Sequence, residues 1–154
     1  WCAHTAPPAA AGISSGYAGP TDFSLDGVGF HLTTVQYAAT KSDPVRSELA
    51  VEIRYGVQRV LVAQDIDSRL MAALATGEAS HARVVITSTA SQDVLRSKAL
   101  AAIQPDLVVV TSKASRANPA DATNIAGARV VRTDTAGTIT FRVKPDELRI
   151  ATER

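Results

Sequence analysis

Two short runs of apolar residues, unbroken by polar positions, constrain the fold of this chain most. Leu107–Val110 is apolar at every position, and so is Val84–Ile86. A strand that is apolar on both sides is covered on both sides, as in the sheets of α/β proteins. Each run follows a segment with helical spacing of apolar residues, at 66–76 and at 92–104. The sequence therefore predicts a mixed β-sheet with two main helices on one of its faces.

The strands expected before the first helix have a different pattern. Apolar and polar residues alternate over 28–33 and over 49–55, which is typical of strands with one wet face. Asp26-Gly27 is a turn pair suited to a tight hairpin, so residues 23–25 form its first arm. The segment 59–63 is nearly all apolar and lies close behind 49–55 in the chain. We expect 49–55 and 59–63 to pair as an antiparallel hairpin, with 59–63 the more central strand.

The last third of the chain predicts two more strands. Residues 113–127 read as a loop with one helical turn at most. The segments 129–132 and 138–143 read as a closing hairpin with a turn at Asp134–Gly137, and the tail from Lys144 as short and charged. The expected order is β-β-β-α-β-α-β-β-β, which belongs to the α/β class.

Length and charge limit the classes of protein that fit. A chain of 154 residues, 45% hydrophobic and 20% charged, matches one globular domain, which we place at 21–154. Residues 1–20 are rich in Pro, Gly and Ala and predict a linker or an irregular arm. The net charge of +1 provides no strong field for nucleic acid or an anionic membrane. No apolar run reaches the ~18 residues of a membrane span, so we expect none in this chain.

Motifs with a known chemistry are missing. The sequence has no P-loop, no G-x-S-x-G elbow and no G-x-G-x-x-G loop. Cys2 is the single cysteine, which excludes an intrachain disulfide and a cysteine-based zinc site. The three histidines are far apart in the sequence and have no ligand spacing. The sequence predicts no cofactor and no catalytic residue.

Weaker candidates remain where expected strands end. Asp65 and Asp67 follow the strand 59–63, at the end where α/β folds place ligands, and two carboxylates could bind a cation. Acidic residues in the first turn of a helix are favourable without any ligand, and we prefer that reading. The hydroxyl run at 88–91 fits a helix cap better than a nucleophile, for which His81 is the nearest base in the sequence.

Three arginines are the candidates for nucleic-acid binding. Arg129, Arg132 and Arg142 can share a patch near the expected closing hairpin. Basic residues on a hairpin form a solvated face more often than a phosphate site. The low net charge also argues against this role, which we keep as a third hypothesis.

Several stretches resemble a known family. Arg46–Gly56 reads RSELAVEIRYG, where the family has an Arg-Ser pair and then a stretch such as LVLRLEYG. Val60–Asp65 reads VLVAQD, where the family has a strand that ends in Gly-Asp. A later strand led by proline corresponds to Pro105–Val110, and the family's last hairpin is similar to Gly127–Asp134 with Gly137–Thr140.

On these residues, the chain from Phe23 to Val143 resembles the C-terminal half of the metallo-β-lactamase fold, in the version found at the end of DNA-internalisation competence proteins of the ComEC type. The resemblance implies one sheet, with its helices, of a sandwich in which two sheets pack face to face between outer helices. It puts Asp65 at the place of the family's metal-bridging aspartate. The parent would be a membrane-associated protein, with this domain outside the cytoplasm.

Departures from the family suggest a degenerate active site. Ser88 or Thr89 replaces the histidine of the family's His-His-Gly-Ser run. A Gly-His-Pro motif that follows later in the family is missing here. The family's His-x-His-x-Asp-His cluster belongs to an N-terminal half that this chain lacks. Hydrolysis in this fold needs metal ions held by several His and Asp ligands. We expect a metal-free, non-catalytic domain with a structural or partner-binding role. The alternative is a fragment of a metal-dependent hydrolase or nuclease whose histidines lie in the missing half.

The doubly apolar strands also imply an assembly. The helices 66–76 and 92–104 cover one sheet face, so the second face needs another layer. We expect the strands within 22–36 and the hairpin 47–63 to fill part of it. A homodimer or a missing partner chain would cover the remainder, because a large uncovered apolar face is rare in soluble monomers.

Overall fold

The computed structural model describes residues 21–37, 46–64, 68–76, 81–88, 95, 98–112, 124–125 and 127–153. The predicted arm 1–20 lies outside these residues. So do Asp65, Asp67 and most of the predicted loop 113–127.

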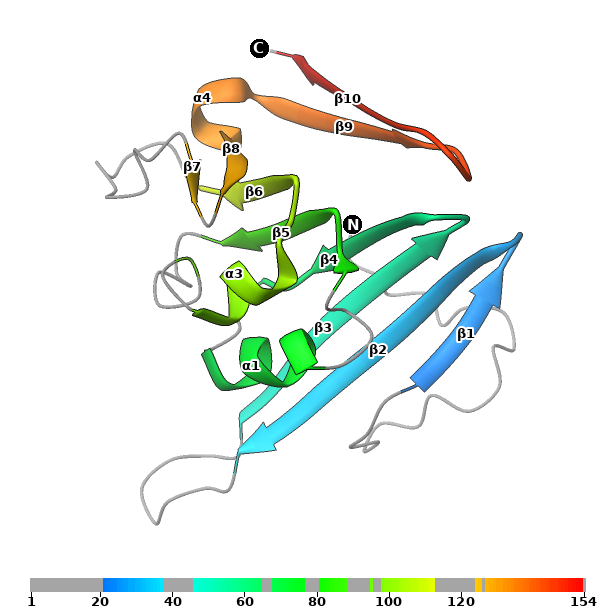
Figure 1. Ribbon diagram of the computed structural model, residues 1–154, viewed down its shortest axis with the longest axis vertical. Coiled ribbons are helices and arrows are strands. Elements are labelled where there is room, and N and C mark those ends of the chain that lie inside the picture. The colour runs from blue at the N-terminus through cyan, green and yellow to red at the C-terminus, as the bar shows by residue number, and fades with distance from the viewer. Residues whose placement is uncertain are drawn as a thin grey trace.

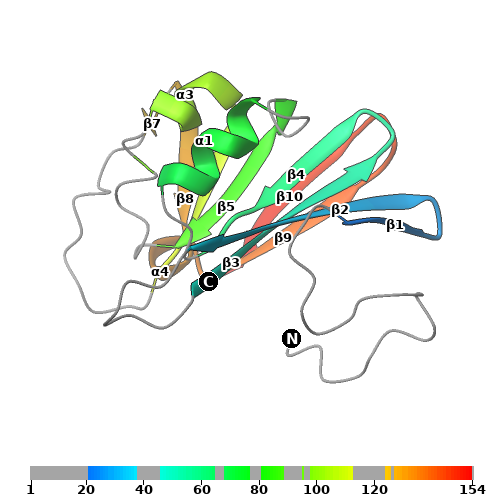
Figure 2. The same ribbon diagram turned by 90° about the horizontal axis from the view of Figure 1, so that it is seen from below.

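The predicted mixed α/β class is confirmed, in three layers (Figures 1 and 2). The central layer is an eight-stranded sheet with the order β1-β2-β3-β4-β5-β6-β8-β7. Its strands are β1 (Thr21–Leu25), β2 (Val28–Tyr37), β3 (Arg46–Tyr55), β4 (Gln58–Val62), β5 (Val84–Ser88), β6 (Leu107–Thr111), β7 (Asn124–Ile125) and β8 (Ala128–Arg132). The described helices are α1 (Ser68–Thr76), α3 (Lys98–Ile103) and the short α4 (Thr133–Ala136). A second sheet holds β9 (Thr138–Val143) and β10 (Leu148–Glu153).

The large sheet has an antiparallel half and a parallel half. Strands β1 to β4 pair antiparallel, with the β1–β2 hairpin turning at Asp26-Gly27 as the sequence predicts. Strands β4, β5, β6 and β8 then pair parallel, with α1 between β4 and β5 and α3 between β5 and β6 on one face of the sheet. The hairpin expected from 49–55 and 59–63 is confirmed as β3–β4.

The helices cover one face of the parallel half (Figure 2). Leu70, Met71 and Leu74 of α1 and Leu100 and Ile103 of α3 pack into one buried cluster. From the sheet, Leu61, Val85, Val108 and Val110 join them, and all four are at most 1% exposed. The unbroken apolar runs of β5 and β6 are therefore covered on this side by helices, as predicted.

The other face of the parallel half is covered by the β9–β10 hairpin. Val60, Val84, Leu107 and Val109 are buried there, with Ile139, Phe141 and Leu148 packed against them. The prediction that 22–36 and 47–63 fill this face is wrong, because β1 to β4 lie in the plane of the same sheet. The covering layer comes instead from the end of the chain.

The predicted closing hairpin of 129–132 with 138–143 is also wrong. Residues 133–136 form α4, and Gly137 follows at φ +74°, which only glycine adopts readily. This turn takes the chain out of the large sheet, so β9 pairs with β10 and not with β8. The tail read as charged is half of that hairpin.

A contact between two turns fixes the far end of the β9–β10 hairpin. The backbone N–H of Val57, in the β3–β4 turn, donates to the carbonyl oxygen of Pro145 at 2.8 Å. Gly56 has φ +57°, and a side chain there would overlap the Pro145 backbone. The small sheet is thus anchored to the β3–β4 turn at one end and follows α4 at the other.

Candidate functional site

The first candidate is the edge where the parallel strands end, the place predicted from Asp65 and Asp67. Thr133 joins the ends of β6 and β8: its hydroxyl accepts from the backbone N–H of Ser112 at 3.0 Å and lies 3.3 Å from the Ser112 carbonyl oxygen. The Thr111 hydroxyl donates to the carbonyl oxygen of Thr87 at 3.2 Å, between β6 and β5. These hydroxyl groups are engaged in holding strand ends together, a structural role.

An ion pair lies at the same edge. The Arg132 guanidinium donates to both carboxylate oxygens of Asp134, at 2.9 and 2.5 Å, and both side chains are only 11–12% exposed. The hydrogen bond from Arg132 holds the pKa of the Asp134 carboxyl below its usual value of 3.8; burial opposes this effect, and the positive charge of Arg132 adds to it. This pair is a further brace where β8 leads into α4.

The metal ligands suggested by the sequence are not placed by the structure. Asp65 and Asp67 lie outside the described residues, as do positions 89–91. Within the described residues, no group of three or more His, Cys, Asp and Glu side chains could hold a metal ion. Ser88 ends β5 and is half-buried.

The three candidate arginines are not gathered into one patch. By strand alternation, Arg129 and Arg132 point to opposite faces of the large sheet, and Arg132 is occupied by Asp134. Arg142 is exposed on β9, opposite Arg149 of β10. A phosphate backbone would have to contact separate surfaces to reach all three, and nucleic-acid binding through them stays a prediction.

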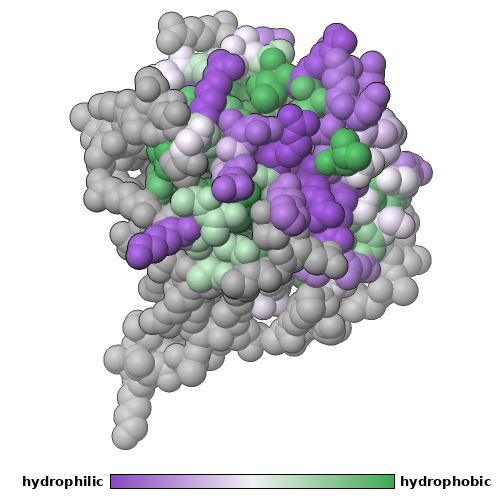
Figure 3. Space-filling model, viewed as in Figure 1, coloured by the Kyte–Doolittle hydropathy of each residue, from purple (hydrophilic) through white to green (hydrophobic). Residues whose placement is uncertain are grey.

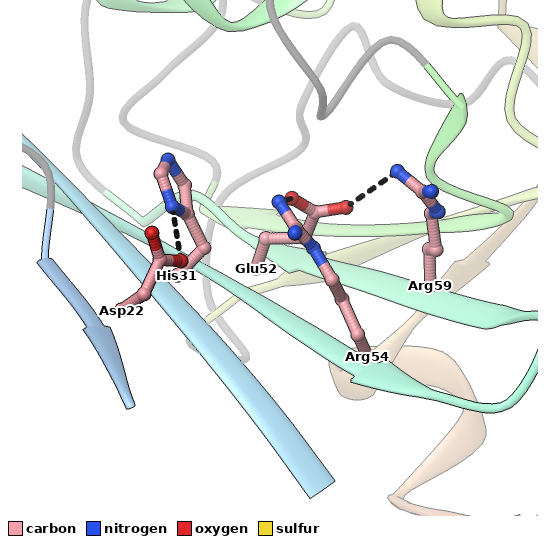
Figure 4. A network of polar contacts seen from close by, with 5 residues as sticks. All are labelled: Asp22, His31, Glu52, Arg54 and Arg59. Atoms are coloured by element: carbon pink, nitrogen blue, oxygen red, sulfur yellow. Dashed lines mark hydrogen bonds and ion pairs between the residues drawn. The ribbon is translucent and has the colours of Figure 1, made fainter. Parts of the chain in front are cut away.

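Alternation in the antiparallel half places polar residues on the helix side of the sheet (Figure 4). Glu52 is 1% exposed and accepts from Arg54 at 2.7 Å and from Arg59 at 3.5 Å. Next to it in the register, His31 Nδ1 lies 2.7 Å from the carboxylate of Asp22. Figure 3, seen from the same side as Figure 1, shows hydrophilic surface beside the helices.

The opposite side of the same strands is apolar. Phe23, Leu25, Phe30, Leu32, Leu49 and Val51 alternate with the polar residues and so share one face; we call these six residues the open face. Phe23 and Phe30 stack with ring centroids 4.8 Å apart. Leu25 is 63% exposed and Leu49 is 47% exposed. Neither is covered by the β9–β10 hairpin, which packs on the other half of the sheet.

The register shows where the cover ends. One row across the strands runs from Phe23 to Phe30, Ile53, Val60, Val84 and Leu107. In this row, Val60, Val84 and Leu107 are at most 7% exposed, whereas Phe23, Phe30 and Ile53 are half-buried. All six side chains in this row are apolar, but the β9–β10 hairpin covers the row only as far as β3.

Sequence reasoning missed both features of the antiparallel half. The alternation predicts an apolar side on these strands, but not that the described part of the chain leaves this side open. The available signal was the alternation of apolar and polar positions along each strand. The apolar positions of all three strands fall on one face, and that face is opposite to the helices. The buried Glu52 had no signal of its own, since an acidic residue in an alternating strand normally faces water.

Two general findings complete the description. Among the described helices, none combines the length and the apolar character needed to cross a membrane, in agreement with the prediction for this chain. No family model, curated protein or solved structure matches the chain.

Proposed function

We propose that this chain is a non-catalytic, metallo-β-lactamase-like domain that binds a partner through the open face. The observation that carries the proposal is the half of an apolar sheet face that no described element of the chain covers. The role is structural or partner-binding, within a parent protein related to the membrane-associated DNA-uptake family.

The apolar content of the open face supports a binding role. Single exposed leucines are ordinary, but here two large exposed side chains border four half-buried ones on adjacent strands. Contiguous apolar patches of this kind mark interaction sites on soluble domains. Complete burial of one such side chain contributes roughly 1.5–3 kcal/mol, so a partner that covers several of them binds favourably.

The shape and charge of the face define the partner. The described positions on this side of β1 to β3 carry no charged side chain, so a charged surface would lose hydration there without an ionic partner. A flat sheet face is best covered by another layer of β-structure, about 10 Å away, as in β-sandwiches. The resemblance implies the same partner, since that fold packs two sheets face to face.

The alternative hypothesis, that the chain is a fragment of a metal-dependent hydrolase, also requires a binding role for the open face. A missing N-terminal half would sit on the open face and supply the histidines, so docking alone does not separate the two hypotheses. The replacements of family histidines by Ser88 or Thr89 favour the non-catalytic version.

Metal analysis of the purified protein, with a phosphodiesterase assay, tests the absence of catalysis. We expect substoichiometric metal and no activity above buffer. Stoichiometric zinc or manganese, with phosphodiesterase activity that a chelator abolishes, would overturn the non-catalytic assignment.

A dye that fluoresces on apolar surfaces tests the exposure of the open face. At low micromolar protein, 8-anilinonaphthalene-1-sulfonate should bind the wild-type chain, and Leu49→Ser should weaken binding several-fold. Val57→Ser is the matched control, because Val57 is 71% exposed but lies in the β3–β4 turn, outside the open face. Equal effects of the two substitutions, or no dye binding by the wild type, would contradict an accessible docking face.

A further inference from the structure

We propose that the open face also binds a second copy of this chain, in a two-fold symmetric dimer with open face against open face. The inference rests on the proposed function in one respect only, the accessibility of that face. It adds a definite occupant and a definite geometry.

The β9–β10 hairpin covers one half of the sheet face and ends beside the other half, which leaves a step in height between the two halves. The β9–β10 hairpin is one sheet thick and covers only the half of the face around Val60, Val84 and Leu107. The other half lies lower by one layer, about 10 Å. If a second copy places its own open face on this lower half, its large sheet lies level with the first copy's hairpin. Because the axis is two-fold, the first copy's large sheet also lies level with the second copy's hairpin. The stepped surfaces of the two copies are therefore complementary.

Free strand edges support the same arrangement. Within the described residues, β1 is the outer strand of the large sheet, and β9 pairs on one side only, with β10. In Figure 1, β9 lies between β10 and the large sheet, so the unpaired edge of β9 is the inner edge of the hairpin. The 41% exposure of Ile150 on β10, compared with half-buried Phe141 on β9, agrees with β10 being the outer strand.

The two-fold operation brings these edges together. With one copy's β2 above the other's β2, the second copy's β1 lies above the first copy's β3, next to the unpaired edge of β9. The same contact occurs again at the other end of the dimer. Two edges that are open in the monomer are each paired with a neighbour, which removes the exposed backbone groups that edge strands otherwise present.

Charge poses no obstacle to self-association. A two-fold contact uses the same surface on both copies, so a charged patch would face an equally charged patch and repel it. The described open-face side of β1 to β3 is uncharged, whereas the helix side of the same strands carries Asp22, His31, Glu52 and Arg54. Only the apolar side is therefore suited to a contact with itself.

The size of the contact sets the expected affinity. Three strands ~4.8 Å apart, over about seven residues at ~3.4 Å each, give roughly 350 Å² per copy before the edge contacts are added. Stable interfaces bury about 800 Å² per partner, so this dimer belongs to the weak, transient class. We expect a dissociation constant on the order of 100 μM, and an equilibrium that a tighter β-sheet partner displaces.

Sedimentation equilibrium between about 10 μM and 1 mM tests the dimer. The wild-type chain should change from monomer to dimer over this range, and Leu25→Ser or Leu49→Ser should each raise the dissociation constant at least tenfold, because each substitution removes two leucines per dimer. Val57→Ser and Ile150→Ser, at the other two exposed large apolar residues, should change it less than threefold. All four positions are exposed, so folding is preserved, which circular dichroism verifies.

Hydrogen exchange at 1 mM compared with 10 μM provides a second readout. Amides of β1 and β9 should exchange more slowly at the higher concentration, and amides of β10 should not change. A wild-type chain that stays monomeric at 1 mM overturns the dimer. If that monomer binds the apolar dye, the open face is a docking site for another partner and the dimer is wrong. If the monomer binds dye only after removal of residues 1–20, that segment covers the open face, and the dimer is again wrong. A dimer weakened by Ile150→Ser but not by Leu49→Ser also overturns the arrangement.

Discussion

The two halves of the large sheet both carry apolar residues on the face opposite to the helices, but they differ in what covers that face. In the parallel half, α1 and α3 pack on one face and the β9–β10 hairpin on the other, so Val84, Val108 and Leu107 are almost fully buried. In the antiparallel half, the helix side is polar, and no described helix or strand covers the opposite side, the open face. The apolar residues of a strand face therefore do not identify, by themselves, the element that covers it.

The largest difference between the halves should appear on truncation of an apolar side chain. Leu107→Ala leaves a cavity beneath the hairpin and should lower the free energy of unfolding by about 2–5 kcal/mol. Leu49→Ala, on the open face, should cost less than about 1 kcal/mol, because Leu49 is 47% exposed already. Urea unfolding of both variants below 10 μM, a concentration at which the proposed dimer is dissociated, measures this. Equal losses would show that the open face is buried in solution.

Gly56→Ala should uncover the protected half. The new methyl group overlaps the Pro145 backbone at a φ of +57°, so the anchor of the hairpin is lost along with roughly 2–3 kcal/mol. Gly27→Ala is the matched control: its φ is +78°, but nothing lies within 4 Å of the added atom. That control should cost only about 1 kcal/mol of backbone strain. Thermal unfolding compares the two, and extra dye binding by Gly56→Ala alone would locate the exposed surface under the hairpin.

The polar side of the antiparallel half should depend on Glu52. Glu52→Gln removes the charge between Arg54 and Arg59, and we expect a loss of about 1–3 kcal/mol, limited by the partial exposure of both arginines. Asp22→Asn should cost less than about 0.5 kcal/mol, because Asp22 is 71% exposed. Chemical denaturation at pH 7 measures both. A silent Glu52→Gln would mean that the arginines are stabilised by other groups.

The Arg132–Asp134 pair should make stability depend on pH at the edge of the parallel half. Since the folded-state pKa of Asp134 lies below 3.8, its contribution is complete above about pH 5 and is lost as the pH falls through that lowered value. Asp134→Asn should therefore cost about 1–2 kcal/mol at pH 7 and less at pH 3. Unfolding curves at the two pH values, with Asp146→Asn as an exposed control, test the sign. A cost that does not change with pH would assign the loss to packing.

The smallest expected effect has the opposite sign. Thr87 is fully buried in β5, and its hydroxyl has no hydrogen-bond partner in the described structure. Thr87→Val replaces that hydroxyl by a methyl group of similar size and should raise stability by about 0.5–1 kcal/mol. A calorimetric melting temperature is sensitive enough to detect this. A decrease would reveal a hydrogen bond to a residue that the structure does not describe.

The sequence predicted the parallel half more fully than the antiparallel half. The runs at 84–86 and 107–110 correctly indicated cover on both faces, and the spacing within 66–76 and 92–104 correctly assigned the helices to one of them. The sequence did not predict that the β9–β10 hairpin covers the second face, because Leu148 and Ile150 lie among charged residues in a segment too short for a clear strand pattern. That segment is a strand because Ile139 and Phe141 on β9 offer it a partner, a tertiary effect that local pattern does not record.

The candidate site was predictable only in part. The alternation in 28–33 and 49–55 indicated an apolar face on each strand, but it does not determine the register that pairs Phe30 with Ile53. The sequence could not reveal that the hairpin ends its cover near β3, because this depends on the direction that α4 and Gly137 give to the chain. The separation of Arg129 from Arg132 was within reach of the sequence, because two residues three positions apart in the expected strand 129–132 point to opposite faces.

The origin of the covering hairpin has a consequence for how the protein is made. A ribosome releases β5 and β6 well before β9 and β10, so the apolar side that the hairpin will cover is exposed while the last part of the chain, from Ser112 to Glu153, is still being synthesised. Nascent surfaces of this kind are the ones that chaperones protect. A chain cut short before Thr138 lacks the hairpin on the face opposite to the helices, and premature termination is therefore a direct route to aggregation for this domain.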